Sequence, residues 1–432
     1  MSSTATIVAL ASGRPPAAIA VIRVSGPLAW SAGGALIGGN LPEPRRLSLR
    51  RLTDPADGSM LDMAMVAVFP GPATATGEDL AELHLHGGAA VIDGVLAALL
   101  AMPGVRLAEP GEFTRRGFHN NRLDLTQVEG VADLIAAETT AQRTQALALT
   151  GGALSRAADA WRSRCIDVLA DAEAALDFAE EEADVAERLQ IVAQARLRDM
   201  VDEISVLVAD ASRAARVRDG LTIAVTGPPN VGKSSIVNAL AMREAAIVSH
   251  LAGTTRDPIE VPLDLGGVAA TLIDTAGLRE TDDFVEAEGI RRARARAIAA
   301  DLVLHISDGT CTLESSSGLQ VVNKADLGTV GLPGALLVSA ARGDGIADLR
   351  SHLVDWAQSA VRPGEPALLS HARHREAFAA AGLALAEAAE ADDPVLRAEG
   401  LRHAAVAFGS VAGRIGVDDI LDRIFSRFCI GK

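Results

Sequence analysis

The sequence contains no tyrosine, and aromatic residues of all kinds make up only 3% of its 432 residues. Sequence-tolerant binding of single-stranded nucleic acid depends on aromatic side chains that stack on bases, so we do not expect such a platform here. Positive charge is also in deficit, with 40 Lys and Arg against 56 Asp and Glu and a formal net charge of -16. This balance argues against a broad nucleic-acid-binding face, and contacts with RNA should be local or supplied by a partner.

Cysteine and long apolar runs are equally scarce. The three cysteines, Cys165, Cys311 and Cys429, are widely separated and give neither a disulfide framework nor metal-ligand spacing. Cys429 lies near the end of the chain, but Lys432 is a poor last residue for a prenylation box. No stretch reaches the roughly 18 uninterrupted apolar residues of a membrane span, and no secretory or transit signal is visible. We therefore expect a cytoplasmic protein.

Residues 221–235, LTIAVTGPPNVGKSS, carry the most informative pattern in the chain. A β-branched apolar run leads into Gly-x-x-x-x-Gly-Lys-Ser, and apolar residues then recur at helical intervals. This is a P-loop in its required strand, loop and helix context. Its glycines let successive N–H groups point at phosphate oxygens, and the helix adds the positive end of its dipole. We expect Lys233 to reach the β- and γ-phosphates and Ser234 to ligate Mg2+.

Three later loops decide which nucleotide the P-loop holds. Residues 274–277, Asp-Thr-Ala-Gly, follow an apolar strand and suit a carboxylate that binds Mg2+ through water and a glycine amide that contacts the γ-phosphate. Residues 323–326, Asn-Lys-Ala-Asp, end another strand, and residues 339–341 fit a last base-contacting loop. Asp326 can accept hydrogen bonds from N1–H and the 2-amino group of guanine, whereas adenine leaves it unpaired, a difference of roughly 10,000-fold. The pattern predicts a GTPase.

The groups that would drive hydrolysis differ from those of Ras-type proteins. Residues 253–257, Gly-Thr-Thr-Arg-Asp, supply a switch threonine, Thr255, able to ligate Mg2+ when a γ-phosphate is present. Leu278 stands where Ras-type proteins have the glutamine that orients water. Glu280 is the nearest polar candidate in that loop, and the sequence assigns no arginine finger.

Residues 1–118 are predicted to form a small α/β domain. Three apolar runs in it read as strands, at Thr6–Leu10, Ile19–Val24 and Met63–Phe69. In a further stretch, alternation places two leucines on one face and Glu82, His84 and His86 on the other. Two histidines and a glutamate could ligate a metal, although no third cluster of ligands is near. A polar strand face, structural or ligand-binding, is the alternative.

The rest of the chain is Ala-rich and helical on both sides of the nucleotide motifs. Apolar residues recur there at helical spacing, as at Val131, Leu134, Ile135, Trp161, Cys165, Val168, Ala172 and Leu176. We expect a multidomain α/β plus α protein: one helical bundle formed by two chain segments, 119–215 and 356–432, and an inserted, Ras-like P-loop G domain at 216–355. Such a layout would let a nucleotide switch move a bundle.

Several motifs outside the P-loop region occur together. They are TIVAL at 6–10, TGED at 76–79, HGG at 86–88, PGEFT at 110–114, LDLTQ at 123–127, GTTRD at 253–257 and FCIGK at 428–432. The combination resembles the MnmE (TrmE) family of tRNA-uridine-modifying GTPases, over essentially the whole chain. The N-terminal motifs and the Cys-Ile-Gly-Lys end carry the resemblance, because many translation-related GTPases share the G-domain motifs.

The resemblance implies a homodimer joined through N-terminal, tetrahydrofolate-binding-like domains. A 5-formyl or 5,10-methylene tetrahydrofolate would donate one carbon, and a partner flavoprotein, MnmG, would hold FAD. Together they would install an aminomethyl or carboxymethylaminomethyl group on carbon 5 of the wobble uridine of certain tRNAs. The folate contacts carried over by motif are Arg23, Glu82, Arg122 and Lys432. Glu82 suits this role, because a pterin carries the same amino-pyrimidinone edge as guanine. Arg122 stands where lysine is common in the family, a change that keeps the charge.

The resemblance also implies a K+-activated GTPase, in which K+ beside the phosphates neutralises developing charge as an arginine would. The matching K+ positions are Asn230, Ser249, Leu251 through its carbonyl, and Thr254. Glu280 matches the catalytic glutamate of the family. The full set of predicted GTP-binding residues is Asn230, Gly232, Lys233, Ser234, Ser235, Ser249, Thr254, Thr255, Asp274, Gly277, Asn323, Lys324, Asp326, Ser339 and Ala340.

A second hypothesis assigns the chain to a different class of GTPase. The chain could be a ribosome-assembly or RNA-binding switch GTPase that modifies nothing and uses residues 1–118 as an interaction module. Glu82 with Arg23, and the Cys-Ile-Gly-Lys end, distinguish the two readings, because a pure switch does not need them.

Overall fold

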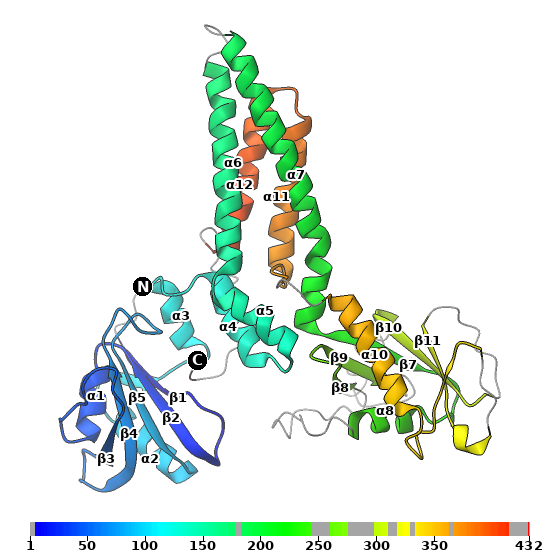
Figure 1. The fold of residues 1–432 in the computed structure, drawn as a ribbon. Coiled ribbons are helices and arrows are strands. Elements are labelled where there is room, and N and C mark those ends of the chain that lie inside the picture. Colours follow the sequence, from blue (N-terminus) through cyan, green and yellow to red (C-terminus); the bar gives the residue numbers. More distant parts are fainter. Residues whose placement is uncertain are drawn as a thin grey trace, which may run out of the picture. The chain divides into compact units, whose positions relative to one another are not determined.

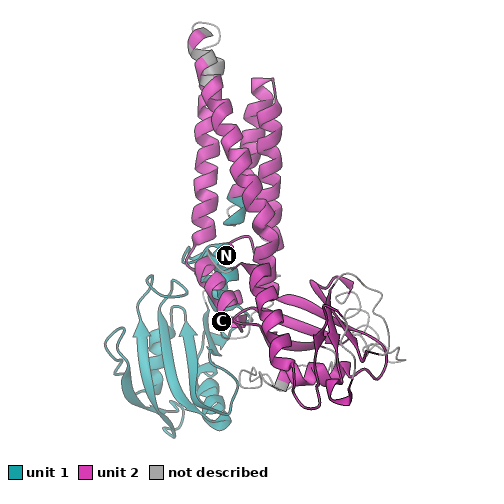
Figure 2. Cartoon of the chain, turned by 45° about the vertical axis from the view of Figure 1, so that its right-hand side comes forward, with its two compact units in different colours: residues 1–132, 409–432 teal, residues 133–408 magenta. Residues whose placement is uncertain are grey.

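The computed structural model describes residues 5–177, 183–242, 260–274, 298–309, 318–328, 333–362, 367–413 and 431. The chain divides into two compact units, residues 1–132 with 409–432 and residues 133–408, shown in teal and magenta in Figure 2. The first unit therefore joins segments from the two ends of the sequence.

The first unit is built on a mixed sheet whose six strands lie in the order β3-β4-β5-β2-β1-β6 (Figure 1). The strands are β1 (Thr6–Leu10), β2 (Ala17–Ser25), β3 (Ser48–Thr53), β4 (Met60–Phe69), β5 (Leu80–Gly87) and β6 (Val105–Leu107). Neighbours are antiparallel except β1 and β6. The sequence did not predict β3 or β6: the first carries two arginines and lies at the sheet edge, and the second has three residues.

Helices cover the two faces of this sheet unequally. On one face, α1 (Ala29–Leu36) and α2 (Ala89–Leu100) enclose a core that includes Leu83. On the other, α3 (Glu112–His119) lays Phe113 against β1. The predicted alternation in β5 is confirmed, because its leucines are buried while Glu82, His84 and His86 lie on the α3 side.

The second unit contains a group of helices and a second sheet. These helices come from two stretches of the chain. The first stretch holds α4 (Leu125–Ala136), α5 (Thr140–Thr150), α6 (Ala153–Asp177) and α7 (Ala183–Asp219), and the second holds α11 (Ala372–Glu390) and α12 (Pro394–Val411). α4 crosses the boundary between the two units. α7 packs against both α6 and α11, and Trp161 stacks on Phe408 with ring centroids 5.7 Å apart. Of the residues that recur at helical spacing, Cys165 and Val168 are buried, whereas Ile135 is 47% exposed.

The nucleotide motifs of the second unit lie on a second six-stranded sheet. Its strands are β7 (Leu221–Thr226), β8 (Glu260–Asp264), β9 (Ala269–Asp274), β10 (Leu302–Ser307), β11 (Leu319–Val322) and β12 (Leu336–Leu337). The order is β12-β11-β10-β7-β9-β8, and all neighbours are parallel except the β8–β9 hairpin. Two helices, α8 (Lys233–Met242) and α10 (Ile346–Val361), and a 3-10 turn, η3 (Ala325–Leu327), complete the described part. The carboxyl ends of the parallel strands therefore meet at one edge.

The two outermost strands of this second sheet, β12 and β8, are poor partners for a further strand. β12 has two residues, and β8 carries Pro262, which lacks a backbone N–H, at its centre. Within the residues described, no helix is long and apolar enough to cross a membrane.

Candidate nucleotide-binding site

The P-loop runs from the end of β7 to the start of α8, as the sequence predicted. Asn230 and Gly232 both have positive φ, 63° and 91°. A Cβ added at Gly232 would overlap the side-chain nitrogen of Asn323, so only glycine fits between the phosphate loop and the base loop. The two loops are therefore in direct contact.

Lys233 is held inside the loop that it closes. Its Nζ donates to the carbonyl oxygens of Gly227 at 2.9 Å and Pro228 at 2.7 Å, and the residue is only 7% exposed. An ammonium group at this position neutralises negative charge, which is what bound β- and γ-phosphates supply.

The two described candidates for the Mg2+ centre also meet. Ser234 Oγ donates to Asp274 Oδ2 at 2.9 Å, because β7 and β9 pair with Val225 opposite Asp274. A hydroxyl and a carboxylate are the oxygen ligands that Mg2+ takes in nucleotide sites, directly or through water. Ser235 follows on the exposed side of the first turn of α8.

The base-recognition residues form a hydrogen-bonded group around buried Asn323. Asn323 Nδ2 donates to the carbonyl of Val231 at 2.9 Å, and its Oδ1 accepts from the amide of Ala340 at 3.1 Å. Ser339 Oγ donates to Asp326 at 2.7 Å, and this hydrogen bond lowers the pKa of the Asp326 carboxyl. A carboxylate fixed in this way matches the paired donors of guanine.

One contact of this loop was not predicted. Lys324 has a positive φ of 64°, and its Nζ lies 3.2 Å from Asp308, which follows β10. The only signal in the sequence was the acidic residue after a strand, which is too common to single out.

Several predicted nucleotide and ion contacts lie outside the described residues. These are Ser249, Leu251, Thr254, Thr255, Gly277 and Glu280. Their roles stay predictions.

The second candidate site lies on the polar face of the first sheet. Arg23 on β2 and Glu82 on β5 are direct cross-strand neighbours, and Arg23 Nη2 donates to Glu82 Oε1 at 2.8 Å. His84 Nε2 lies 3.4 Å from the other oxygen, Oε2, and Phe113 of α3 lies against the guanidinium at 5.8 Å. The ring of Phe113 is itself buried against Ile7 and Ala9, so it supports Arg23 from beneath the polar face.

The other folate candidates are placed less fully. Arg122 Nε donates to the carbonyl of Thr74 at 3.3 Å. Lys432 lies outside the described residues, but its neighbour Gly431 is buried so tightly against Leu10 that a Cβ would overlap the Leu10 carbonyl. Among the described residues no group of three or more metal-ligating side chains occurs, and His86 instead pairs with Asp62 at 2.7 Å. His86 and His84 therefore each have a carboxylate partner, Asp62 and Glu82 respectively.

An ion network around buried Arg116 and Glu112 holds α3 on this face. Arg116 contacts Glu78 at 2.9 Å and Glu112 at 3.0 Å, and Arg106 contacts Glu112 at 2.6 Å. Burial alone would raise the pKa of Glu112, but hydrogen bonds from Arg106, the amide of Glu109 and Arg116 outweigh it and lower the pKa to about 2. The network fixes the helix that carries Phe113.

The P-loop, the Ser234–Asp274 pair and the guanine-type loop around Asn323 and Asp326 define the class: this is a P-loop GTPase, a GTP hydrolase. A family model described as the MnmE helical domain matches residues 125–429, and one described as GTP-binding protein TrmE N-terminus matches residues 6–122. The chain belongs to the MnmE (TrmE) family.

Full-length relatives agree with the family models. The tRNA modification GTPase MnmE of Methylorubrum populi is 52% identical over 437 residues, covering 99% of this chain and 98% of its own. The protein of the same name from Azorhizobium caulinodans is 50% identical over 435 residues, covering 100% and 99%. Among solved structures, the FeoB G-domain from Methanococcus jannaschii is 26% identical, with a TM-score of 0.23, over 33% of this chain and 98% of its own.

Proposed function

We propose that this protein is a K+-activated GTPase that modifies carbon 5 of the wobble uridine in certain tRNAs. It acts with the flavoprotein MnmG, which holds the FAD, and takes one carbon from a 5-formyl or 5,10-methylene tetrahydrofolate. The full-length similarity to proteins named tRNA modification GTPase is the observation that carries this proposal. The protein works in the cytoplasm as a homodimer joined through its N-terminal domains.

The proposed domain plan follows the same family. Residues 1–118 form the folate-binding and dimerisation domain, and residues 216–355 form a G domain inserted into a helical domain made of 119–215 and 356–432. The match of one helical-domain model across the G-domain motifs supports an insertion, as does the packing of α11 against α7.

The proposed GTPase centre uses groups that fit a nucleotide with Mg2+. Ser234 and, through water, Asp274 hold Mg2+, which would neutralise charge on the phosphates. Asn230, whose positive φ shapes the P-loop, contributes to K+ binding together with Ser249, Leu251 and Thr254. Thr255 completes the Mg2+ site, and Glu280 orients the attacking water.

The proposed folate site uses the Arg23–Glu82 pair. Arg23 occupies Oε1 of Glu82, and each carboxylate oxygen has two lone pairs, so Oε2 keeps acceptor capacity for the 2-amino edge of a pterin. His84 lies beside the carboxylate, and its half-buried imidazole gives a flat heterocycle an aromatic neighbour, while buried Phe113 holds Arg23 in place. Arg122 and Lys432 bind the anionic glutamate tail.

The modification itself is tested by nucleoside mass spectrometry. Total tRNA from a strain lacking the gene is compared after complementation with the wild type or with Lys233→Ala. We expect the wobble-uridine aminomethyl derivatives to vanish and to return only with the wild type. Unchanged nucleosides in the deletion strain would contradict the proposal and favour the ribosome-assembly or RNA-binding switch.

Folate binding is tested by calorimetry with 5-formyltetrahydrofolate. Glu82→Gln keeps the shape of the side chain but removes the charge that pairs with the pterin and with Arg23, so binding should weaken at least about tenfold. Glu43→Gln is the matched control, because Glu43 forms an exposed pair with Arg46 in the same unit. Equal heats for both variants would refute the assignment of Glu82.

The ionic requirement is tested by comparing GTP turnover in K+ and Na+ at high protein concentration. Equal turnover would refute K+ activation. In K+, Glu280→Ala should abolish turnover with GTP affinity nearly intact, and a large loss of affinity would contradict its catalytic role.

A further inference from the structure

The first turn of α5 is capped from within its own segment and by the second sheet. Thr139 and Gln142 form a reciprocal capping box. The amide of Ala141, one of the four N-terminal amides that lack intrahelical partners, donates to the carbonyl of Gly267 at 3.1 Å. Gly267 belongs to the turn between β8 and β9. The helix therefore begins on the hairpin of the nucleotide-binding sheet.

Gln142 joins this contact to a second helix end. Its Oε1 accepts from the amide of Thr139 at 3.2 Å, while its Nε2 donates to the carbonyl of Arg218 at 3.0 Å. Arg218 lies in the last turn of α7, three residues before β7 and the P-loop. The Gln142 side chain thus hydrogen-bonds a backbone amide at the start of α5 and a backbone carbonyl at the end of α7.

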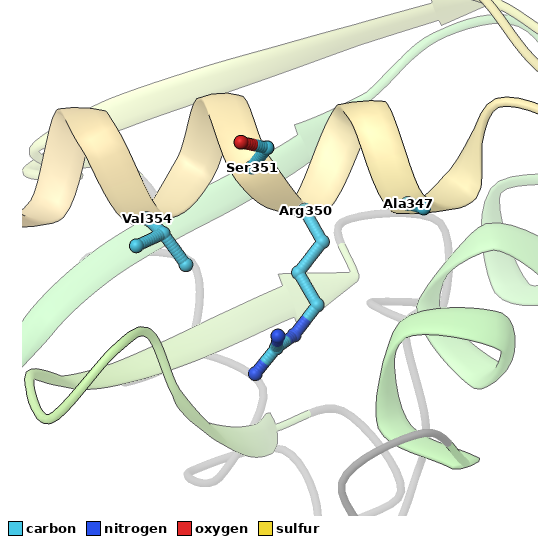
Figure 3. Close-up of a pocket in the computed structure, with 4 residues that line it drawn as sticks. All are labelled: Ala347, Arg350, Ser351 and Val354. Carbon is cyan, nitrogen blue, oxygen red and sulfur yellow. The ribbon is translucent and has the colours of Figure 1, made fainter.

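The hairpin turn is also held on its other side by α10. Gly266 has φ +66°, and a Cβ there would lie 2.8 Å from Val354 and 2.9 Å from Gln358. Arg350 Nη2 donates to the carbonyl of Asp264 at 3.4 Å. Figure 3 shows Arg350 and Val354 extending from the same side of α10. The turn is therefore enclosed between α10 and the first turn of α5, and it cannot shift freely against either.

The opposite end of the hairpin reaches the nucleotide centre. β9 ends at Asp274, whose carboxylate accepts from Ser234 of the P-loop at 2.9 Å. β8 begins three residues after the predicted switch motif, residues 253–257. One end of this two-stranded hairpin therefore lies at the predicted Mg2+ ligands and the other end contacts α5, so the hairpin connects the two places.

We propose that the first turn of α5 is the docking site for the β8–β9 turn, and that nucleotide binding is transmitted to the helical bundle through this contact. Gln142 positions the first turn of α5, because it joins this turn to the end of α7. Ligand binding that stabilises the hairpin must also stabilise whatever the hairpin holds, and the effect is reciprocal. The amide of Ala141 is the natural reporter, because its acceptor belongs to the hairpin.

Hydrogen exchange on the full-length wild type is the first test. A peptide covering residues 138–146 is followed without nucleotide and with a saturating non-hydrolysable GTP analogue and Mg2+. We expect exchange of the Ala141 amide to slow about three- to tenfold on nucleotide binding. An unchanged rate would overturn the proposal without any variant.

Two substitutions at Gln142 separate capping from positioning. Gln142→Glu keeps the acceptor of the capping box but loses the donor to Arg218, whereas Gln142→Ala loses both. We expect both to abolish the nucleotide dependence of Ala141 exchange and both to lower the melting temperature, because each removes the hydrogen bond to the Arg218 carbonyl. Thr144→Ala is the control, because its hydroxyl donates to the carbonyl of Thr140 within the exposed side of the same helix.

Reciprocity gives a quantitative cross-check. The affinity of the Gln142→Glu variant for the GTP analogue should fall by the same factor by which nucleotide slows Ala141 exchange in the wild type. If Gln142→Glu retains the full nucleotide dependence and the wild-type affinity, Gln142 is a helix cap and nothing more. If Gln142→Ala fails to fold, the wild-type and Gln142→Glu measurements still decide.

Discussion

The two sheets present their polar residues in different ways. In the second sheet, the functional side chains follow the carboxyl ends of parallel strands, so loops converge at one edge around Ser234, Asp274 and Asn323. In the first sheet, Arg23 and Glu82 project from the face of two central antiparallel strands. An edge site is shaped by backbone loops, whereas a face site is shaped by whatever helix covers it. The two sites should therefore fail independently and for different reasons.

The largest predicted effect is confined to the edge site. Lys233→Ala removes the only ammonium that the P-loop motif aims at the phosphates, and we expect GTP turnover to fall about 1,000-fold or more. Phosphate release measures this. Folate binding should not change, and a parallel loss of folate affinity would show that the two sites are not independent.

The next effect is confined to the face site. Arg116→Ala leaves half-buried Glu78 without its cation, while Glu112 keeps Arg106, so the first unit should lose about 3 kcal/mol, the lower end for a broken buried pair. Thermal unfolding followed by circular dichroism measures the loss. Arg46→Ala is the control, because its pair with Glu43 is exposed on both sides and contributes little. Equal changes in melting temperature for the two variants would mean that the Arg116 ion pairs do not stabilise the first unit.

Protonation of Glu112 at low pH should break the same ion pairs. The pKa of Glu112 is lowered from 4.5 to about 2, so its stabilisation is complete above about pH 4.5 and is lost as pH falls toward 2. This amounts to about 3 kcal/mol. The difference in unfolding free energy between the wild type and Glu112→Gln should therefore shrink across that window. A constant difference would contradict the lowered pKa.

The smallest effect concerns the helical part, which carries neither site. Burial raises the pKa of the Cys165 thiol to about 12, with Arg164 opposing only weakly. In a Cys311→Ser, Cys429→Ser variant, a thiol reagent at pH 8 should react with Cys165 only after unfolding. Fast reaction of the native protein would show that this core opens readily.

The comparison also explains what the sequence could predict. The residues of the edge site could be named from the sequence because each loop is a contiguous motif, but the Ser234–Asp274 and Asp326–Ser339 hydrogen bonds were not predicted, because they depend on how separate strands pair. The face site was only half readable. Alternation identified Glu82 and His84, but Phe113 and the Arg116 network come from a helix about thirty residues away in the sequence, and no local pattern specifies that docking. Short or charged strands such as β3 and β6 were missed because their sequences lack an apolar run.

The nucleotide-binding sheet also bears on self-association. An exposed strand edge is a template on which another chain can add a strand, and this is a common start of aggregation. Here one edge, β12, offers two residues, and the other, β8, has Pro262 at its centre between the acidic Glu260 and Asp264. A missing donor and like charges discourage strand addition. Replacing Pro262 with valine would restore the donor in a β-branched residue, and such a chain should precipitate at concentrations that the natural sequence tolerates.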